Sequence, residues 1–191
     1  MARNREFDVD TAVDRAMDLF WRRGYAATSL QDLLGEMSIG SGSLYAAFGS
    51  KEKLYARALE RYCSVYTYGF AERLENATDV RTAVRSVLLE MVEADLAEPE
   101  RGCLVVNAAT ERSDDPTTAD RVAAALRLLE SALAGALERA KTRGELSPDK
   151  DPAELARFLT TFVQGLRVVG KARLGRAFVE DAVSTALRAL D

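Results

Sequence analysis

Residues 24–54 read GYAATSLQDLLGEMSIGSGSLYAAFGSKEKL, with two short apolar segments separated by glycine and serine. The pattern predicts a short helix over residues 29–36, with Thr28 as its N-cap and Gln31 completing a capping box. A turn over residues 37–40 then leads to a second short helix over residues 41–48. Two short helices joined by a four-residue turn are typical of a helix-turn-helix.

An amphipathic helix is predicted directly before this pair, over residues 9–23, and Gly24 would end it. Its apolar face would brace the two short helices and comprises Val9, Val13, Ala16, Met17 and Phe20. Three helices therefore form an N-terminal unit.

The second short helix has small or polar residues on its outward face, whereas Leu44 and Phe48 point inward. The outward residues are Ser41, Gly42, Ser43, Ala46 and Ala47. Glycine lowers helix stability, so a purely structural helix rarely gathers such a set. A helix that enters the major groove of DNA needs a narrow, polar face of this kind. We interpret the segment as a recognition helix; a helical hairpin within a bundle is the alternative.

Helical periodicity continues to the end of the chain, and no strand pattern interrupts it. A long helix capped by Ser50 is predicted over residues 51–74. Further helices are predicted over residues 79–97, 103–111, 117–143, 152–174 and 176–190. The chain is thus predicted to be all-α, with about nine helices and a domain boundary near residue 50.

The composition excludes several classes of catalytic site. Among its 191 residues the chain has no histidine and only two cysteines, Cys63 and Cys103. A Ser-His-Asp triad is therefore impossible, and the cysteine spacing fits neither a zinc site nor a redox pair. We expect no metal, no cofactor and no enzymatic activity. A thiol-dependent protein that uses Cys103 is the remaining catalytic alternative.

No apolar run reaches the roughly 18 residues that a membrane span requires, and the N-terminus lacks a signal-peptide core. The low cysteine content is typical of a reducing compartment. We therefore expect a cytoplasmic protein without a membrane partner.

Two segments carry a resemblance to a known family. Residues 24–33 are similar to the Gly-Tyr-x-x-Thr-Ser-x-x-Asp-Ile segment of TetR-family transcriptional repressors, and residues 42–54 resemble their recognition helix. The resemblance spans about residues 8–60. It implies a DNA-binding domain over residues 1–50 and an effector-binding and dimerisation domain over residues 51–191. It further implies a homodimeric repressor that a small-molecule effector releases from a palindromic operator of double-stranded DNA.

The resemblance also assigns roles to residues on the DNA-binding side. Thr28, Tyr45 and Lys51 would meet phosphates, the last at a helix N-terminus that attracts anions. The second short helix would face the bases with Ser41, Gly42, Ser43 and Ala46. A basic N-terminal arm with Arg3 and Arg5 would enter the minor groove.

Two residues of the turn depart from the family pattern. Ser38 stands where the family usually has glycine, and a positive φ there would cost a serine roughly 1–2 kcal/mol. Gly40 stands where serine or threonine is usual, and glycine is a weaker N-cap. The turn geometry is therefore expected to differ slightly.

The effector pocket is expected between the long helix and its neighbours. Aromatic and methionine side chains suit an apolar ligand with a few polar groups. The candidates are Tyr62, Tyr66, Phe70, Met91, Cys103, Asn107, Phe162 and Lys171. Ordinary core packing is the alternative for each aromatic residue.

Residues 101–107, RGCLVVN, resemble a Gly-Cys-x-x-x-Asn stretch in one TetR branch, some of whose members sense oxidants or electrophiles. A thiol at a helix N-terminus beside cations such as Arg101 and Lys171 would carry more thiolate. A buried, inert thiol is the alternative interpretation of Cys103. Asn107 would lie one turn later on the same face.

The last two helices carry apolar stripes that would form the dimer interface. They comprise Phe158, Phe162, Val169, Phe178, Val179, Val183 and Leu187. The alternative is that these residues fill the core of one subunit. A helical small-molecule-binding protein without DNA binding also remains as an alternative function.

The net charge of −4 is unevenly distributed. Residues 1–62 hold nine basic and nine acidic residues, so the excess of acid lies in the remainder of the chain. No acidic residue lies between residues 37 and 51. We expect modest non-specific DNA affinity and a dependence on paired, dimeric sites.

Overall fold

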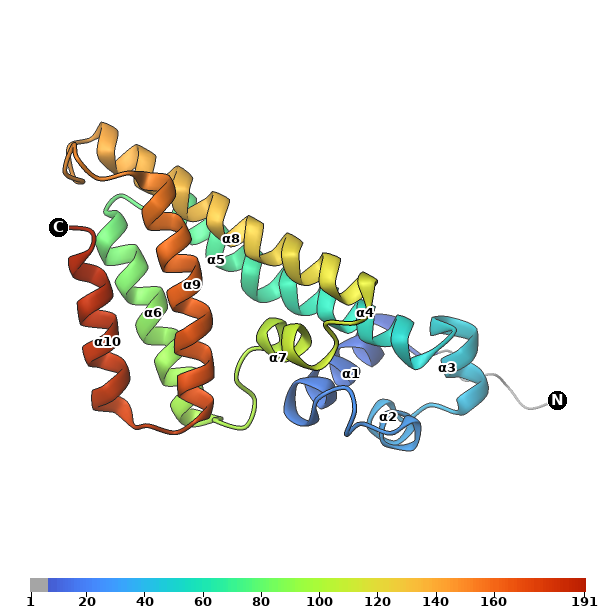
Figure 1. The fold of residues 1–191 in the computed structure, drawn as a ribbon. Helices are drawn as coiled ribbons and strands as arrows, with labels where there is room; N and C mark the ends of the chain where they lie inside the picture. The colour runs from blue at the N-terminus through green and yellow to red at the C-terminus, as the bar shows by residue number, and fades with distance from the viewer. Residues whose placement is uncertain (1–6) are drawn as a thin grey trace.

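The computed structural model describes residues 7–191, in which helices are joined by loops and no strand occurs. The chain is elongated, with the three N-terminal helices at one end (Figure 1). At the other end lie α6 (Val80–Ala97), α9 (Pro152–Lys171) and α10 (Arg176–Arg188). Arg3 and Arg5, the proposed minor-groove arm, lie outside the described residues.

The N-terminal unit has three helices, α1 (Val9–Arg23), α2 (Leu30–Met37) and α3 (Ser41–Phe48). The bounds of α1 and α3 agree with the sequence prediction. Leu19, Phe20, Leu33, Leu44 and Phe48 form the core between them. Val9 was predicted to face this core but is 38% exposed, because it lies in the first turn, before α1 meets its partners.

The cap of α2 differs from the prediction by one residue. Ser29, not Thr28, is the N-cap: its hydroxyl accepts from the backbone N–H of Asp32, whose carboxylate accepts from the N–H of Ser29. The Thr28 hydroxyl instead donates to the Gly24 carbonyl at 2.6 Å, and the side chain is fully buried. The capping box exists, with aspartate in place of the expected glutamine.

The turn between α2 and α3 has the expected strain. Ser38 lies in the left-handed region with φ 56° and ψ 40°. Gly40 is the N-cap of α3 and supplies no side-chain hydrogen bond. A serine is thus held in a conformation that favours glycine, which stores strain within the helix-turn-helix.

The long helix that follows is continuous but not uniform. It comprises α4 (Lys51–Tyr62), a π-helical segment η1 (Cys63–Thr67) and α5 (Tyr68–Glu75). The sequence predicted an unbroken α-helix over this range. Single π-turns in α-helices are often found at functional sites, and this one lies beside a cavity described below.

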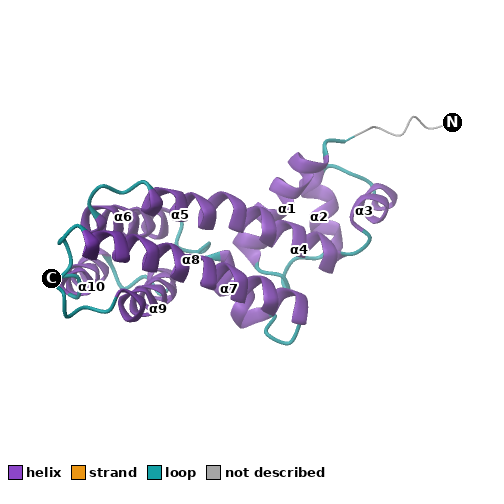
Figure 2. Cartoon of the chain, turned by 90° about the horizontal axis from the view of Figure 1, so that it is seen from above, coloured by secondary structure: helices purple, strands orange, loops and turns teal. Residues whose placement is uncertain are grey.

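The remaining helices are α6 (Val80–Ala97), α7 (Leu104–Glu111), α8 (Pro116–Thr142), α9 (Pro152–Lys171) and α10 (Arg176–Arg188). Counting α4, η1 and α5 as one, residues 7–191 contain nine helices, as predicted. Figure 2 shows α8 running along α4 and α5, with α9 and α10 beneath α6. In the described part of the chain, no helix is sufficiently long and apolar to span a membrane.

Two apolar cores share the long helix. One joins α1–α4 to α7 and the start of α8, and the other joins α5, α6, α9, α10 and the rest of α8. The helix from Lys51 to Glu75 therefore passes from one core into the other. The division at residue 50 stays a prediction, although α4 packs extensively on α1.

Candidate nucleic-acid interface and effector cavity

Helix α3 presents the outward face that the sequence predicted. Tyr45 is 52% exposed, while Leu44 is fully buried and Phe48 nearly so. Ser41, Gly42 and Ala46 are exposed, and Ser43 and Ala47 are half-buried. The face is small, uncharged and aimed into solvent, as a helix that docks in a groove requires.

Lys51, predicted to contact a phosphate, is half-buried and makes contacts within the chain. Its ammonium donates to the Tyr25 carbonyl at 2.7 Å and lies 4.1 Å from the centre of the Tyr25 ring. Burial lowers the pKa of Lys51. The cation thus holds the loop before α2. Thr28 is fully buried, and both phosphate contacts stay predictions.

A cavity of about 380 Å³ lies beside η1. It has walls from α1, α4, η1, α5, α6, α7, α8 and α9. Five of the eight predicted effector residues line it, namely Tyr62, Tyr66, Phe70, Met91 and Cys103. Its volume falls within the usual range for small-molecule sites.

The other three predicted effector residues lie outside this cavity. Asn107 is turned toward the loop before α7, where its amide donates to the Arg101 carbonyl at 3.1 Å. Lys171 donates to the side-chain oxygen of Asn107 at 3.2 Å, and its aliphatic stem lies against Gly102, the neighbour of Cys103. Phe162 stacks beside Phe158, with ring centroids 6.1 Å apart. The spacing of residues along α9 does not indicate which side of this helix faces the cavity.

The cavity wall also contains residues that the sequence pattern did not predict, above all Trp21, Arg73, Gln164 and Arg167. Trp21 comes from α1, which the sequence assigned wholly to the DNA-binding unit. Its ring meets Tyr62 and Tyr66 edge-on, with centroids 5.0 and 5.1 Å away. The only indication in the sequence of a role for Trp21 is that this large aromatic residue stands at the polar end of the predicted helix, beside Arg22 and Arg23.

The two thiols have different surroundings. Cys103 is the N-cap of α7, lines the cavity and accepts a hydrogen bond from the Tyr62 hydroxyl at 3.5 Å. Burial raises the pKa of Tyr62, which keeps this hydroxyl protonated as the donor. Cys63 is not part of the cavity wall, and burial raises the pKa of its thiol to about 11.

The Gly102 carbonyl joins the cavity to α1. It accepts from the Trp21 indole N–H at 3.0 Å and from the Arg167 guanidinium at 2.6 Å. Arg167 is buried and pairs with Asp95 of α6 at 2.9 Å. Desolvation raises the pKa of Asp95 in spite of this cation. The loop before α7 is thus held between the two cores.

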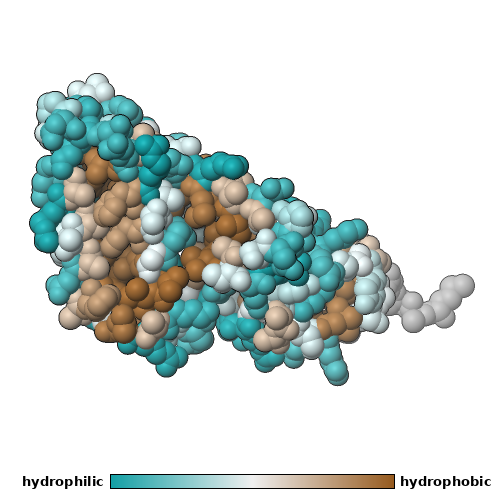
Figure 3. Space-filling model, in the orientation of Figure 1, coloured by the Kyte–Doolittle hydropathy of each residue, from teal (hydrophilic) through white to brown (hydrophobic). Residues whose placement is uncertain are grey.

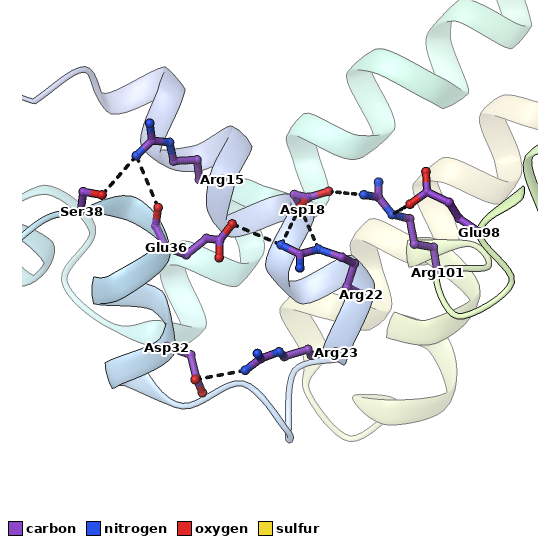
Figure 4. A network of polar contacts seen from close by, with 9 residues as sticks. All are labelled: Arg15, Asp18, Arg22, Arg23, Asp32, Glu36, Ser38, Glu98 and Arg101. Atoms are coloured by element: carbon purple, nitrogen blue, oxygen red, sulfur yellow. Dashed lines mark hydrogen bonds and ion pairs between the residues drawn. The ribbon is translucent and has the colours of Figure 1, made fainter.

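Polar contacts continue from this loop to the helix-turn-helix (Figure 4). Arg101 pairs with Asp18 at 2.8 Å, Asp18 with Arg22, and Arg22 with Glu36 of α2 at 3.2 Å. Arg15 adds contacts of 3.4 Å to the Glu36 carbonyl and the Ser38 hydroxyl. These groups are partly exposed, so each pair contributes little stability. Together they align α1 and α2 with the loop.

The far end of the molecule has an apolar surface. Figure 3 shows hydrophobic side chains gathered over α9 and α10. Phe158, Val168, Leu174 and Phe178 are 44–55% exposed. Three residues of the predicted dimer stripe, Val179, Val183 and Leu187, are buried in the core of this chain instead. Helix α10 therefore uses one face for its own core and leaves Phe178 outside it.

The exposed recognition helix, braced by α1 and α2, defines the chain as a helix-turn-helix regulator. Family models agree: residues 12–58 match the bacterial regulatory proteins of the tetR family, and residues 74–186 match the tetracyclin repressor-like C-terminal domain. The chain belongs to the TetR family and is a DNA-binding transcriptional regulator. The matched families and relatives are regulators, not enzymes.

Three relatives illustrate the match. An uncharacterized HTH-type regulator of Bacillus subtilis, YezE, is 36% identical over the whole of both chains. The repressor ComR of Escherichia coli is 30% identical over 97% of this chain and 90% of its own. A cysteine-substituted CifR, solved with 26-bp operator DNA, is 38% identical over the whole of both chains, with a TM-score of 0.87.

Proposed function

We propose that the protein is a homodimeric repressor that leaves a palindromic operator when a small molecule occupies the cavity. The position of Trp21 carries this proposal. Its ring forms part of the cavity wall, yet it belongs to α1, the helix that braces α2 and α3. A ligand there would touch the DNA-binding unit directly.

The coupling requires that the ligand favour one arrangement of the two cores. Trp21 and Arg167 share the Gly102 carbonyl, so a ligand that moves either side chain disturbs the other's hydrogen bond. Arg101, next in the chain, pairs with Asp18 of α1. Movement of this loop would therefore tilt α1 and change the separation of the two recognition helices.

Dimerisation follows from the small reading surface of α3. A helix of eight residues contacts few bases, and two-fold half-sites about one helical turn apart double the contacts. The apolar surface over α9 and α10 suits the interface, because contiguous apolar patches mark sites of association. It lies at the end opposite α3, which leaves both recognition helices exposed. We assign this activity to the cytoplasm, on chromosomal DNA.

The test begins with operator selection from random double-stranded DNA by the wild-type protein. A two-fold symmetric consensus is expected, and a single half-site should bind more weakly. Tyr45→Phe and Ala46→Asp should weaken binding, the latter because a carboxylate would face the negative DNA. Ala124→Asp, at an exposed alanine of α8, is the control. Failure to enrich any sequence would contradict the proposal.

The position of Cys103 supports a second class of effector, namely an electrophile or oxidant that modifies this thiol. The observation that favours it is the placement of Sγ in the cavity wall beside the Tyr62 hydroxyl. With a Michael acceptor, sulfur would form the new C–S bond and the thiol proton would end on the α-carbon of the acceptor.

The two cysteines make this class of effector testable in one chain. N-ethylmaleimide should label Cys103 before Cys63, as read by peptide mass spectrometry, and labelling should release the operator. Cys103→Ser should abolish release, and Cys63→Ser should leave it intact. Equal release from the Cys103→Ser variant would exclude thiol sensing but leave reversible ligand binding untouched.

A further inference from the structure

The volume of the cavity indicates the scale of the molecule that would fill it. At about 380 Å³ it is more than twice an engineered cavity of roughly 150 Å³ that binds benzene. A molecule with two fused rings therefore fits, with space for one substituent. A single small ring would leave part of the apolar wall without contacts.

The wall of the cavity has two cations, and both are neutralised by acidic partners. Arg73 forms a two-point contact with Glu90, with distances of 2.6 and 2.7 Å. Arg167 pairs with Asp95 and uses its other donors on the carbonyls of Met91 and Gly102. An ionised ligand would lose its hydration and find no net counter-charge in the wall, which is unfavourable.

The aromatic part of the wall offers a stacking surface. Trp21, Tyr62 and Tyr66 form one cluster, in which the Tyr62 and Tyr66 rings lie 4.7 Å apart. Tyr66 is 45% exposed although it lines the cavity, so part of its ring is available to a ligand. Because Tyr66 belongs to η1, the irregular segment of the long helix presents this ring to the cavity.

Gln164 supplies a polar contact on the α9 side. Within residues 7–191 its side chain makes one hydrogen bond, from Nε2 to the Thr160 carbonyl at 3.3 Å. The amide oxygen is therefore available to accept a hydrogen bond. A ligand that donates one hydrogen bond from a ring substituent would satisfy it.

We propose that the cavity binds an uncharged, two-ring aromatic molecule with one hydrogen-bond donor, stacked on Tyr66 and bonded to Gln164. This inference deepens the proposed function, since it names the effector class of the same cavity. It needs no covalent step and is independent of Cys103.

The test uses four probes that share the naphthalene ring system and compares their binding to the full-length protein by titration calorimetry. The probes are 2-naphthol, naphthalene, 2-naphthoate and 2-naphthylmethylammonium. The neutral donor 2-naphthol should bind tightest, with an advantage of about 3–10-fold over naphthalene from its hydrogen bond. Both ions should bind at least about tenfold more weakly than 2-naphthol. Emission from Trp21, the chain's single tryptophan, should change as the cavity fills.

Variants locate the probe. Gln164→Leu should remove the advantage of 2-naphthol over naphthalene, and Tyr66→Leu should weaken both by about 3–10-fold. Tyr68→Leu is the matched control, because Tyr68 is exposed, two residues away and not part of the wall. Thermal melts of each variant exclude a loss of folding as the cause.

Three results would overturn the inference: tighter binding of either ion than of 2-naphthol, equal effects of Tyr66→Leu and Tyr68→Leu, or no binding of any probe. Selection of operator DNA by the same preparation is measured separately. A protein that selects an operator but binds no probe would retain the proposed regulation and lose this effector class. A protein that binds 2-naphthol but selects no DNA would retain this effector class and lose the proposed regulation.

Discussion

The Glu111 carboxylate accepts a hydrogen bond from the backbone N–H of Tyr25 at 2.8 Å and a second from the next N–H, of Ala26, at 3.0 Å. Glu111 ends α7, whose N-cap Cys103 lies at the cavity. A Cβ on Gly24 would lie 2.8 Å from the carboxylate and would displace it, and the φ of 81° also favours glycine at this position. One short helix thus reaches from the cavity to the loop that leads into α2.

Glu111→Gln tests this contact. The amide oxygen can still accept one hydrogen bond, but the charge that strengthens both is lost. We expect a loss of about 1 kcal/mol in the free energy of unfolding, because the groups are partly solvated, and weaker operator binding. Urea unfolding and DNA titration measure the two effects. Glu100→Gln, an exposed carboxylate in the loop before α7, should change neither, and an equal response of both variants would contradict this role.

Local signals in the sequence predicted the helices well. The run from Ser41 to Phe48 has a glycine at each boundary, and the structure ends α3 at those residues. The positive φ of Ser38 was expected because the family usually has glycine there, and the structure confirms it. Such features depend on neighbouring residues, so one sequence is sufficient to predict them.

Contacts between distant segments were harder to predict. Lys51 begins α4, and its position predicts a phosphate contact but not its contacts with the Tyr25 carbonyl and ring, which the fold brings close. Trp21 lines the cavity because its indole N–H meets the Gly102 carbonyl, in the loop before α7. Val183 and Leu187 share the helical period of an interface stripe, yet α6 covers them in the same chain. Periodicity identifies an apolar face but not the partner that covers it.

Ser38→Gly should stabilise the protein. Relief of the left-handed conformation favours the variant by roughly 1–2 kcal/mol, and the greater freedom of unfolded glycine removes about half of that. We expect a net gain of about 0.5–1 kcal/mol in urea unfolding with operator affinity unchanged. Arg173→Gly is the matched control, since Arg173 has φ 60° beyond α9. A destabilised Ser38→Gly variant would show that the Arg15 contact outweighs the strain.

Phe158→Asp combined with Phe178→Asp tests the proposed dimer surface. Both rings are about half-exposed in the single chain, so the change should cost the monomer little. Charges in an apolar interface should raise the dimer dissociation constant by about 100-fold or more, as read by sedimentation equilibrium. Val9→Asp, equally apolar but on α1, should leave the dimer intact. A double variant that stays dimeric would place the interface elsewhere.

Arg167→Met should destabilise the protein in a pH-dependent way. Loss of the cation leaves Asp95 buried without a partner, and breaking a buried pair costs about 3–5 kcal/mol near neutral pH. The pKa of Asp95 already lies above its ordinary value of 3.8 because of desolvation, and the variant raises it further. A carboxyl with a raised folded-state pKa favours folding below its unfolded pKa and loses that contribution as the pH rises through the folded value. The difference in unfolding free energy between wild type and variant should therefore be small near pH 4 and grow toward pH 7.

Arg73→Met is the comparison for this prediction, because Arg73 is the other cation of the cavity wall. Its partner Glu90 is largely solvated, with the pKa lowered by the Arg73 hydrogen bonds, so the loss of that pair should cost no more than about 1 kcal/mol. Urea unfolding at several pH values measures both variants. A cost for Arg167→Met that is independent of pH would mean that its bonds to the Met91 and Gly102 carbonyls, not the pairing with Asp95, account for its contribution.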